Sequence, residues 1–127
     1  MKIKDLKNIM IETIKHPLSR SVIVENKEGT TIILREKGEY RGVDLSGVNL
    51  SGVKLKGIDL SGANLSNTNL SGTDLRKAKL TDTNFEGAII TGTNFEETNI
   101  KKQQLNKAEF TINPIGISLD TNRNRRK

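Results

Sequence analysis

The stretch ANLSNTNLSGTDLRKAKL, residues 63–80, has a leucine at every fifth position and a small residue two places before each leucine. The same period continues over half of the chain. Its large apolar residues are Leu45, Leu50, Leu55, Leu60, Leu65, Leu70, Leu75, Leu80, Phe85, Ile90, Phe95, Ile100, Leu105 and Phe110. A period this strict predicts a repeat architecture.

The spacing also selects the backbone conformation. On an α-helix, residues five apart differ by about 140° in direction, so this pattern would build no apolar stripe. On an extended chain, residues two apart share a face, so each unit of five offers two inward side chains and then turns. A glycine such as Gly47 or Gly52 often follows the central residue by two places, where a corner needs a positive φ. Lys77, Glu97, Lys102 and Lys107 occupy this position in later units, and their side chains predict a different turn there.

These units resemble the pentapeptide-repeat family, whose unit reads small residue, Asp or Asn, Leu or Phe, and two polar or small residues. The units 63–67 and 73–77 match it closely, and the resemblance covers residues 43–112. It implies an all-β fold, a right-handed quadrilateral β-helix of about 3.5 coils with four units in each coil. Residues twenty apart would then stack, with the outward Asn side chains forming ladders. Gln103 falls in an inward position, which predicts a distortion over Lys101–Gln104.

The flanking segments predict end caps, so we divide the chain into 1–42, 43–112 and 113–127. In the first part, apolar residues at helical spacing predict a short amphipathic α-helix over Lys4–Lys15. Two runs rich in Val, Ile and Thr then predict a β-hairpin around residues 26–29. In the last part, Ile115, Ile117 and Leu119 alternate with small or polar residues. They predict a strand that either caps the last coil or pairs with its copy in a homodimer.

Charge is unevenly distributed along the 127 residues, whose net charge is +6. The first part holds nine basic and six acidic residues, the repeat eight and eight, and the last part four and one, giving +3, 0 and +3. A basic tail predicts nonspecific nucleic-acid binding that weakens with salt. The tail residues are Arg123, Arg125, Arg126 and Lys127.

The charged side chains of the repeat fall mainly on two adjacent faces, which is typical of a solvated surface or of a surface that binds a partner. Ile89 is expected to point outward from another face. Together with Ile89, the candidate partner-binding residues are Lys54, Lys56, Arg76, Lys77, Lys79, Lys101 and Lys102.

Catalytic chemistry has little support in the sequence. The single histidine, His16, stands before a proline without a placed partner group, and no cofactor-binding or metal-binding motif is present. No run of about 20 apolar residues predicts a membrane span, and no signal peptide is evident, so we expect a cytoplasmic protein without a membrane partner.

These observations predict a non-enzymatic interaction module, a rigid rod that binds a protein machine and inhibits or protects it. Three alternatives stay open: protection of a topoisomerase such as DNA gyrase, nucleic-acid binding through the basic termini, and antagonism of a host defence complex by a phage- or plasmid-encoded protein. The gyrase hypothesis rests on the family resemblance, and the neutral charge of the repeat weakens it. Gyrase-protecting members are thought to imitate DNA with an acidic surface.

Overall fold

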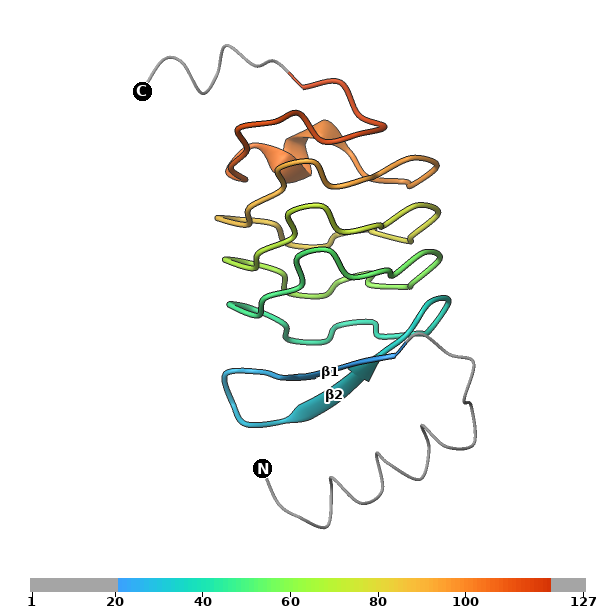
Figure 1. Ribbon diagram of the computed structural model, residues 1–127, viewed down its shortest axis with the longest axis vertical. Coiled ribbons are helices and arrows are strands. Elements are labelled where there is room, and N and C mark those ends of the chain that lie inside the picture. The colour runs from blue at the N-terminus through green and yellow to red at the C-terminus, as the bar shows by residue number, and fades with distance from the viewer. Residues whose placement is uncertain (1–20, 120–127) are drawn as a thin grey trace.

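The computed structural model describes residues 21–119 of the chain. These residues form a stack of coils closed at its N-terminal end by a hairpin (Figure 1). The helix predicted over Lys4–Lys15 and the basic tail lie outside the described residues.

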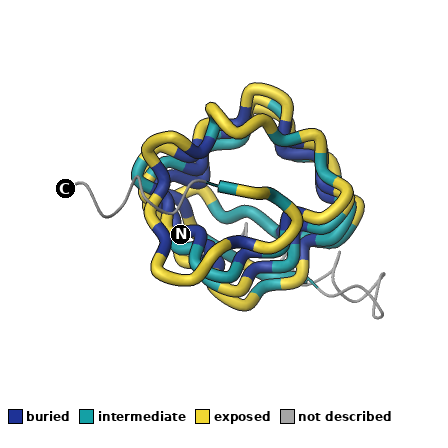
Figure 2. The backbone as a smooth tube through the Cα atoms, turned by 90° about the horizontal axis from the view of Figure 1, so that it is seen from above, coloured by how far each residue is buried: buried dark blue, intermediate teal, exposed yellow. Residues whose placement is uncertain are grey.

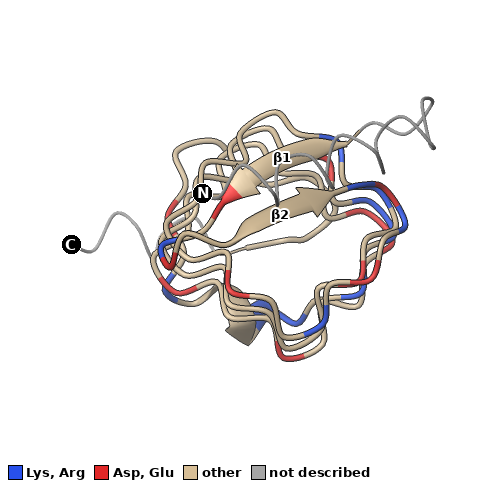
Figure 3. Cartoon of the chain, turned by 90° about the horizontal axis from the view of Figure 1, so that it is seen from below, with Lys and Arg blue, Asp and Glu red and all other residues tan. Residues whose placement is uncertain are grey.

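The hairpin consists of β1 (Val22–Glu25) and β2 (Thr31–Leu34), which pair antiparallel. Its turn is organised by Asn26, whose Oδ1 accepts the N–H of Thr30 at 2.9 Å. The Nδ2 of the same residue donates to the carbonyl of Asp44 at 3.1 Å, which ties the hairpin to the first coil. Seen from below, the two strands lie across the end of the coils (Figure 3). The predicted hairpin is confirmed.

The coils are held together by short parallel bridges between residues twenty apart. They begin at Glu39, which pairs with Asp59, and continue through pairs such as Asp44 with Asn64. The predicted stacking of residues twenty apart is therefore confirmed. We call residues 39–98 the regular coils and residues 99–119 the last coil.

The corners of the regular coils are type II turns, with a positive φ only at the third residue. At one such corner the N–H of Val48 donates to the carbonyl of Leu45 at 3.1 Å, and Gly47 has a φ of 74°. Lys77 and Glu97 both have a φ of 61°, so the prediction of a different turn at these two positions was wrong. The stack enforces this conformation, which costs roughly 1–2 kcal/mol for a residue with a Cβ.

The Asp or Asn position has a local role. The Oδ1 of Asn49 accepts the N–H of Ser51 at 3.0 Å, and the Oδ1 of Asn64 accepts the N–H of Ser66 at 2.9 Å. Each side chain thus closes an Asx turn within its own unit. No hydrogen bond joins the stacked Asn side chains within residues 21–119, so the expectation of ladders between them was wrong.

The core lies inside the coils and consists of the residues that recur every fifth position. Leu45, Leu65, Phe85 and Leu105 form one column, and each is at most 1% exposed. The hydroxyls of the buried threonines between the columns donate hydrogen bonds to backbone carbonyls. Thr73 Oγ1, for example, donates to the carbonyl of Leu50 at 2.7 Å.

The last coil departs from the regular pattern at the predicted place. Residues Lys102–Leu105 form a 3-10 helix, η1, in place of a flat side of the coil. Gln103 is exposed, so its predicted inward position was wrong. The carboxamide is better accommodated in water than in an apolar interior.

The chain returns to the stack in the regular register at Glu109, which pairs with Ile89, and then shifts by one residue. Ile115 pairs with Asn94, twenty-one residues earlier, and its side chain is 49% exposed. Gly116 follows with a φ of 86°, and a Cβ there would lie 2.5 Å from the backbone nitrogen of Glu96. The end of the described chain crosses the upper end of the coils (Figure 2), where Ile117 and Leu119 pack against the core. The predicted strand is therefore reduced to a single β-bridge at Ile115. Of the three residues predicted to cap the last coil, Ile117 and Leu119 cover the core and Ile115 does not.

Candidate interaction surfaces

The charged residues of the coils gather on certain sides, while one side carries few of them (Figure 3). Two of the predicted partner-binding residues, Arg76 and Lys77, are engaged in ion pairs. Arg76 binds Asp74 through two parallel contacts, Nε to Oδ1 at 2.9 Å and Nη2 to Oδ2 at 2.8 Å. These hydrogen bonds lower the pKa of Asp74 and raise that of Arg76. Lys77 Nζ lies 3.7 Å from Glu97 Oε2 in the next coil.

The other five predicted lysines form no ion pair within residues 21–119. They lie on two adjacent sides of the coils, and we call them the lysine face: Lys54, Lys56, Lys79, Lys101 and Lys102. The backbone holds this spacing, because parallel β-bridges join the backbone of Lys54 to that of Asp74 and the backbone of Lys79 to that of Asp59 in neighbouring coils. A partner would thus meet cationic groups whose attachment points are rigid.

An ion pair that sequence reasoning missed lies beside the lysine face. Arg41 Nε donates to Asp59 Oδ2 at 2.8 Å, and the N–H of Ser61 donates to Oδ1 at 3.0 Å. These hydrogen bonds lower the pKa of Asp59 from its ordinary 3.8 to about 2. Asp59 is only 4% exposed, so its charge is largely hidden from a partner. Arg41 precedes the recognised repeat, and only its position eighteen residues before Asp59 could have indicated the contact.

Exposed apolar side chains form a second feature. Ile89 points outward as predicted and is 42% exposed, while its backbone N–H donates to the carbonyl of Thr68 at 2.9 Å. The structure adds Ile112, which is 66% exposed and which sequence reasoning did not single out. Single exposed apolar residues are common on protein surfaces and carry no functional conclusion alone.

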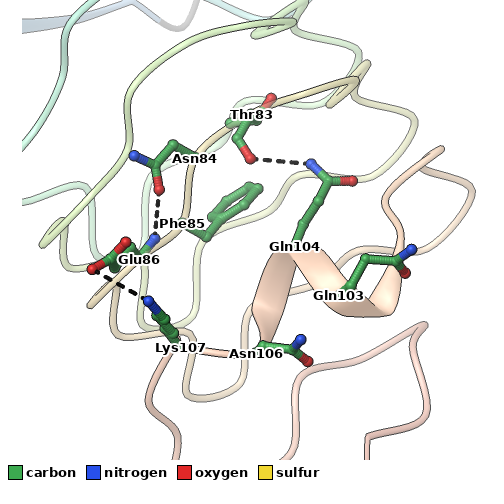
Figure 4. A pocket seen from close by; sticks show the side chains of 8 residues that line it. All are labelled: Thr83, Asn84, Phe85, Glu86, Gln103, Gln104, Asn106 and Lys107. Atoms are coloured by element: carbon green, nitrogen blue, oxygen red, sulfur yellow. Dashed lines mark hydrogen bonds and ion pairs between the residues drawn. The ribbon is translucent and has the colours of Figure 1, made fainter.

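A pocket of about 290 Å³ opens beside η1, where the chain leaves the regular stack (Figure 4). It is lined by Thr83, Asn84, Phe85, Glu86, Gln103, Gln104, Asn106 and Lys107. Gln104 holds the two walls together: its Nε2 donates to the carbonyls of Leu80 at 2.8 Å and Thr83 at 3.1 Å. Sequence reasoning marked this stretch as distorted but predicted no pocket.

Comparison with protein families identifies the repeat. The family profile "Pentapeptide repeats" matches residues 44–82, 69–102 and 78–111, with eight copies. Together these ranges run from 44 to 111, more than half of the 127 residues. The chain belongs to the pentapeptide-repeat family. Comparison with curated proteins gave no match.

Three solved pentapeptide-repeat structures are similar to the chain, each at 26% identity. One is a thylakoid lumen protein of Arabidopsis thaliana, with a TM-score of 0.42; the match covers 65% of each chain. Another, from Nostoc PCC 7120, has a TM-score of 0.37, with 67% of this chain and 75% of that chain covered. The third, HetL from Nostoc sp. strain PCC 7120, is involved in regulating heterocyst differentiation; its TM-score is 0.32, with 64% and 43% covered.

Two further features are absent from the described part of this pentapeptide-repeat chain. Among residues 21–119, no helix is long and apolar enough to cross a membrane. In the same part of the chain, no group of three or more His, Cys, Asp and Glu side chains is placed to hold a metal ion.

Proposed function

We propose that this pentapeptide-repeat protein is a non-enzymatic interaction module that binds an acidic surface of a protein machine and inhibits or protects it. The observation that supports this function is the lysine face. Its five ammonium groups form no ion pair with a carboxylate of the described residues, whereas the arginines Arg41 and Arg76 beside them do. Opposite charge on a partner would speed association and select its orientation.

The rigidity of the attachment points adds to this proposal. In the regular coils, backbone hydrogen bonds such as Leu55 N–H to the carbonyl of Asp74, at 2.9 Å, fix neighbouring coils in register. A surface already in its binding arrangement loses little conformational entropy on association. We expect the protein to act by occupying a surface of its partner, in the cytoplasm.

The alternative functions remain predictions, and each one predicts a different result when binding partners are captured. DNA gyrase protection would make gyrase the captured protein. Nucleic-acid binding would depend on Arg123, Arg125, Arg126 and Lys127, outside the described residues, and would be lost after nuclease treatment. Antagonism of a host defence complex predicts capture of that complex. A homodimer would form without any other protein.

The test is affinity capture from a bacterial lysate, with and without nuclease treatment and at two salt concentrations, with mass spectrometry of the retained proteins. The test variant is Lys79→Glu. The matched control is Lys27→Glu, in the turn of the hairpin and off the lysine face, with the same change in net charge.

We expect a discrete protein to be retained by the natural sequence and the control, and to be lost with the test variant. Equal retention by both variants would overturn the assignment of the lysine face. Loss of all retained material after nuclease treatment would instead support nucleic-acid binding.

A further inference from the structure

Phe85, which lines the pocket beside η1, has a backbone N–H that the repeat would normally pair. One coil below, the N–H of Leu65 donates to the carbonyl of Asn84 at 2.8 Å, and two coils below, that of Leu45 donates to Asn64 at 2.9 Å. The next step of this series would join the N–H of Phe85 to the carbonyl of Gln104. The structure has no such bond, because η1 replaces the flat side of the coil there.

The Phe85 N–H has no hydrogen-bond partner within residues 21–119, although the residue is only 1% exposed. Its two paired relatives in the column point along the stack toward the following coil, so this N–H points toward the displaced segment, where the pocket lies. A buried N–H without a partner costs roughly 1–3 kcal/mol. A ligand with an acceptor oxygen would recover this free energy.

Acceptors at the base of the pocket are already engaged. The carbonyl of Thr83 accepts Gln104 Nε2 at 3.1 Å, and Asn84 Oδ1 accepts the N–H of Glu86 at 2.9 Å. Lys107 brings an ammonium group, 4.0 Å from Glu86 Oε1, with side-chain exposures of 74% and 64% for the lysine and the glutamate. An exposed pair at this distance holds Lys107 only weakly.

We propose that this pocket binds a carboxylate, with one oxygen accepting the Phe85 N–H and the negative charge facing Lys107. A charged acceptor forms a stronger hydrogen bond with an N–H than a neutral one does. The exposed side chain of Glu86 turns away toward solvent when the ligand enters. The carboxylate comes from a peptide chain terminus or from a free small acid; both share this chemistry. The inference goes beyond the proposed function and does not depend on the lysine face.

The test follows backbone amide signals of the full chain by ¹⁵N–¹H NMR at constant ionic strength. Sodium acetate serves as the free small acid, N-acetylglycine as the peptide terminus, and N-methylacetamide as a neutral probe of similar size. We expect a saturable shift of the Phe85 signal with both carboxylates and a much smaller one with the amide. Tighter binding of N-acetylglycine would identify a chain terminus as the source, and equal binding a free acid.

Two neighbouring substitutions should act in opposite directions. Lys107→Gln removes the cation and should weaken acetate binding about two- to fivefold, the range for an exposed pair of charges. Glu86→Gln removes the competing carboxylate and should strengthen binding by about two- to fivefold. Lys27→Gln, in the hairpin turn at the opposite end of the stack, serves as the control and should change nothing.

The same spectra report folding, because unchanged signals from the regular coils show that a variant retains its structure. The proposal is overturned if the Phe85 signal does not saturate with either carboxylate. It is also overturned if N-methylacetamide gives an equal response, or if Lys107→Gln binds acetate as tightly as the natural sequence does.

Discussion

The regular coils and the last coil pair their backbones in different ways. In the regular coils, a backbone N–H meets a backbone carbonyl of the next coil, as in Leu60 N–H to the carbonyl of Lys79 at 2.9 Å. At the last coil, side-chain amides replace these partners: Leu80 N–H donates to Asn99 Oδ1 at 2.7 Å, and Gln104 Nε2 donates to the carbonyl of Leu80. Amide side chains thus allow one side of a β-helix to leave the stack while most of its polar groups remain paired. The resulting gap is the pocket.

The largest expected effect compares two leucines of one interior column, Leu65 in the regular coils and Leu105 in η1, both fully buried. Leu65→Ala should lower the free energy of unfolding by about 3–5 kcal/mol, because ordered coils above and below prevent the cavity from closing. Leu105→Ala should cost only about 2 kcal/mol, because η1 can move inward. Urea unfolding measures both; equal costs would show that the last coil is packed as rigidly as the others.

The next effect compares adjacent glutamines in the last coil. Gln104→Ala leaves the carbonyls of Leu80 and Thr83 without their side-chain donor and should cost about 2–3 kcal/mol of unfolding free energy. Gln103→Ala is the matched control: the side chain is exposed, and the change should stay within about 0.5 kcal/mol.

Thermal unfolding followed by circular dichroism measures both glutamine variants. A Gln104→Ala variant as stable as Gln103→Ala would mean that water replaces the amide without loss. The difference between the regular coils and the last coil would then not depend on this side chain.

The smallest expected effect is a pH dependence that belongs to the regular coils. The pKa of Asp59 is lowered to about 2 from 3.8, so its charged form stabilises the fold above about pH 4. This stabilisation is lost as the pH falls from about 4 to about 2. It amounts to roughly 1–2 kcal/mol, allowing for the exposure of Arg41.

Asp59→Asn keeps the acceptor for Ser61 and removes the titration. The stability difference between the natural sequence and this variant, measured by urea unfolding, should therefore be largest at neutral pH and should vanish near pH 2. A difference that does not change with pH would show that the Arg41 pair contributes nothing.

The features predicted correctly from the sequence depend on local pattern. The period of five placed Leu65 and Phe85 in one buried column, and β-rich runs around residues 26–29 predicted the hairpin between β1 and β2. The errors concern positions where neighbouring coils decide the outcome. Lys77 adopts a glycine-like corner because its N–H must meet the carbonyl of Glu96 at 2.9 Å, one coil away.

The structure shows which of the predicted partner-binding residues form ion pairs within the described chain and which do not. Arg76 and Lys77 form ion pairs with carboxylates, whereas the five residues of the lysine face form none within the described chain. Sequence reasoning could assign residues to faces, because side-chain direction alternates along an extended chain. It could not choose their partners, because rotamers and small shifts of register decide whether two charges lie within 4 Å.

The sequence by itself determined the coil, most of its interior and the corners that carry glycine, because strand geometry and a period of five act within each unit. Only the tertiary structure decided that Ile115 points outward after a one-residue shift, that Arg41 pairs with Asp59, and that the Phe85 N–H has no partner among residues 21–119. Each of these outcomes depends on groups about twenty residues away in the chain, which come together only when one coil lies on the next.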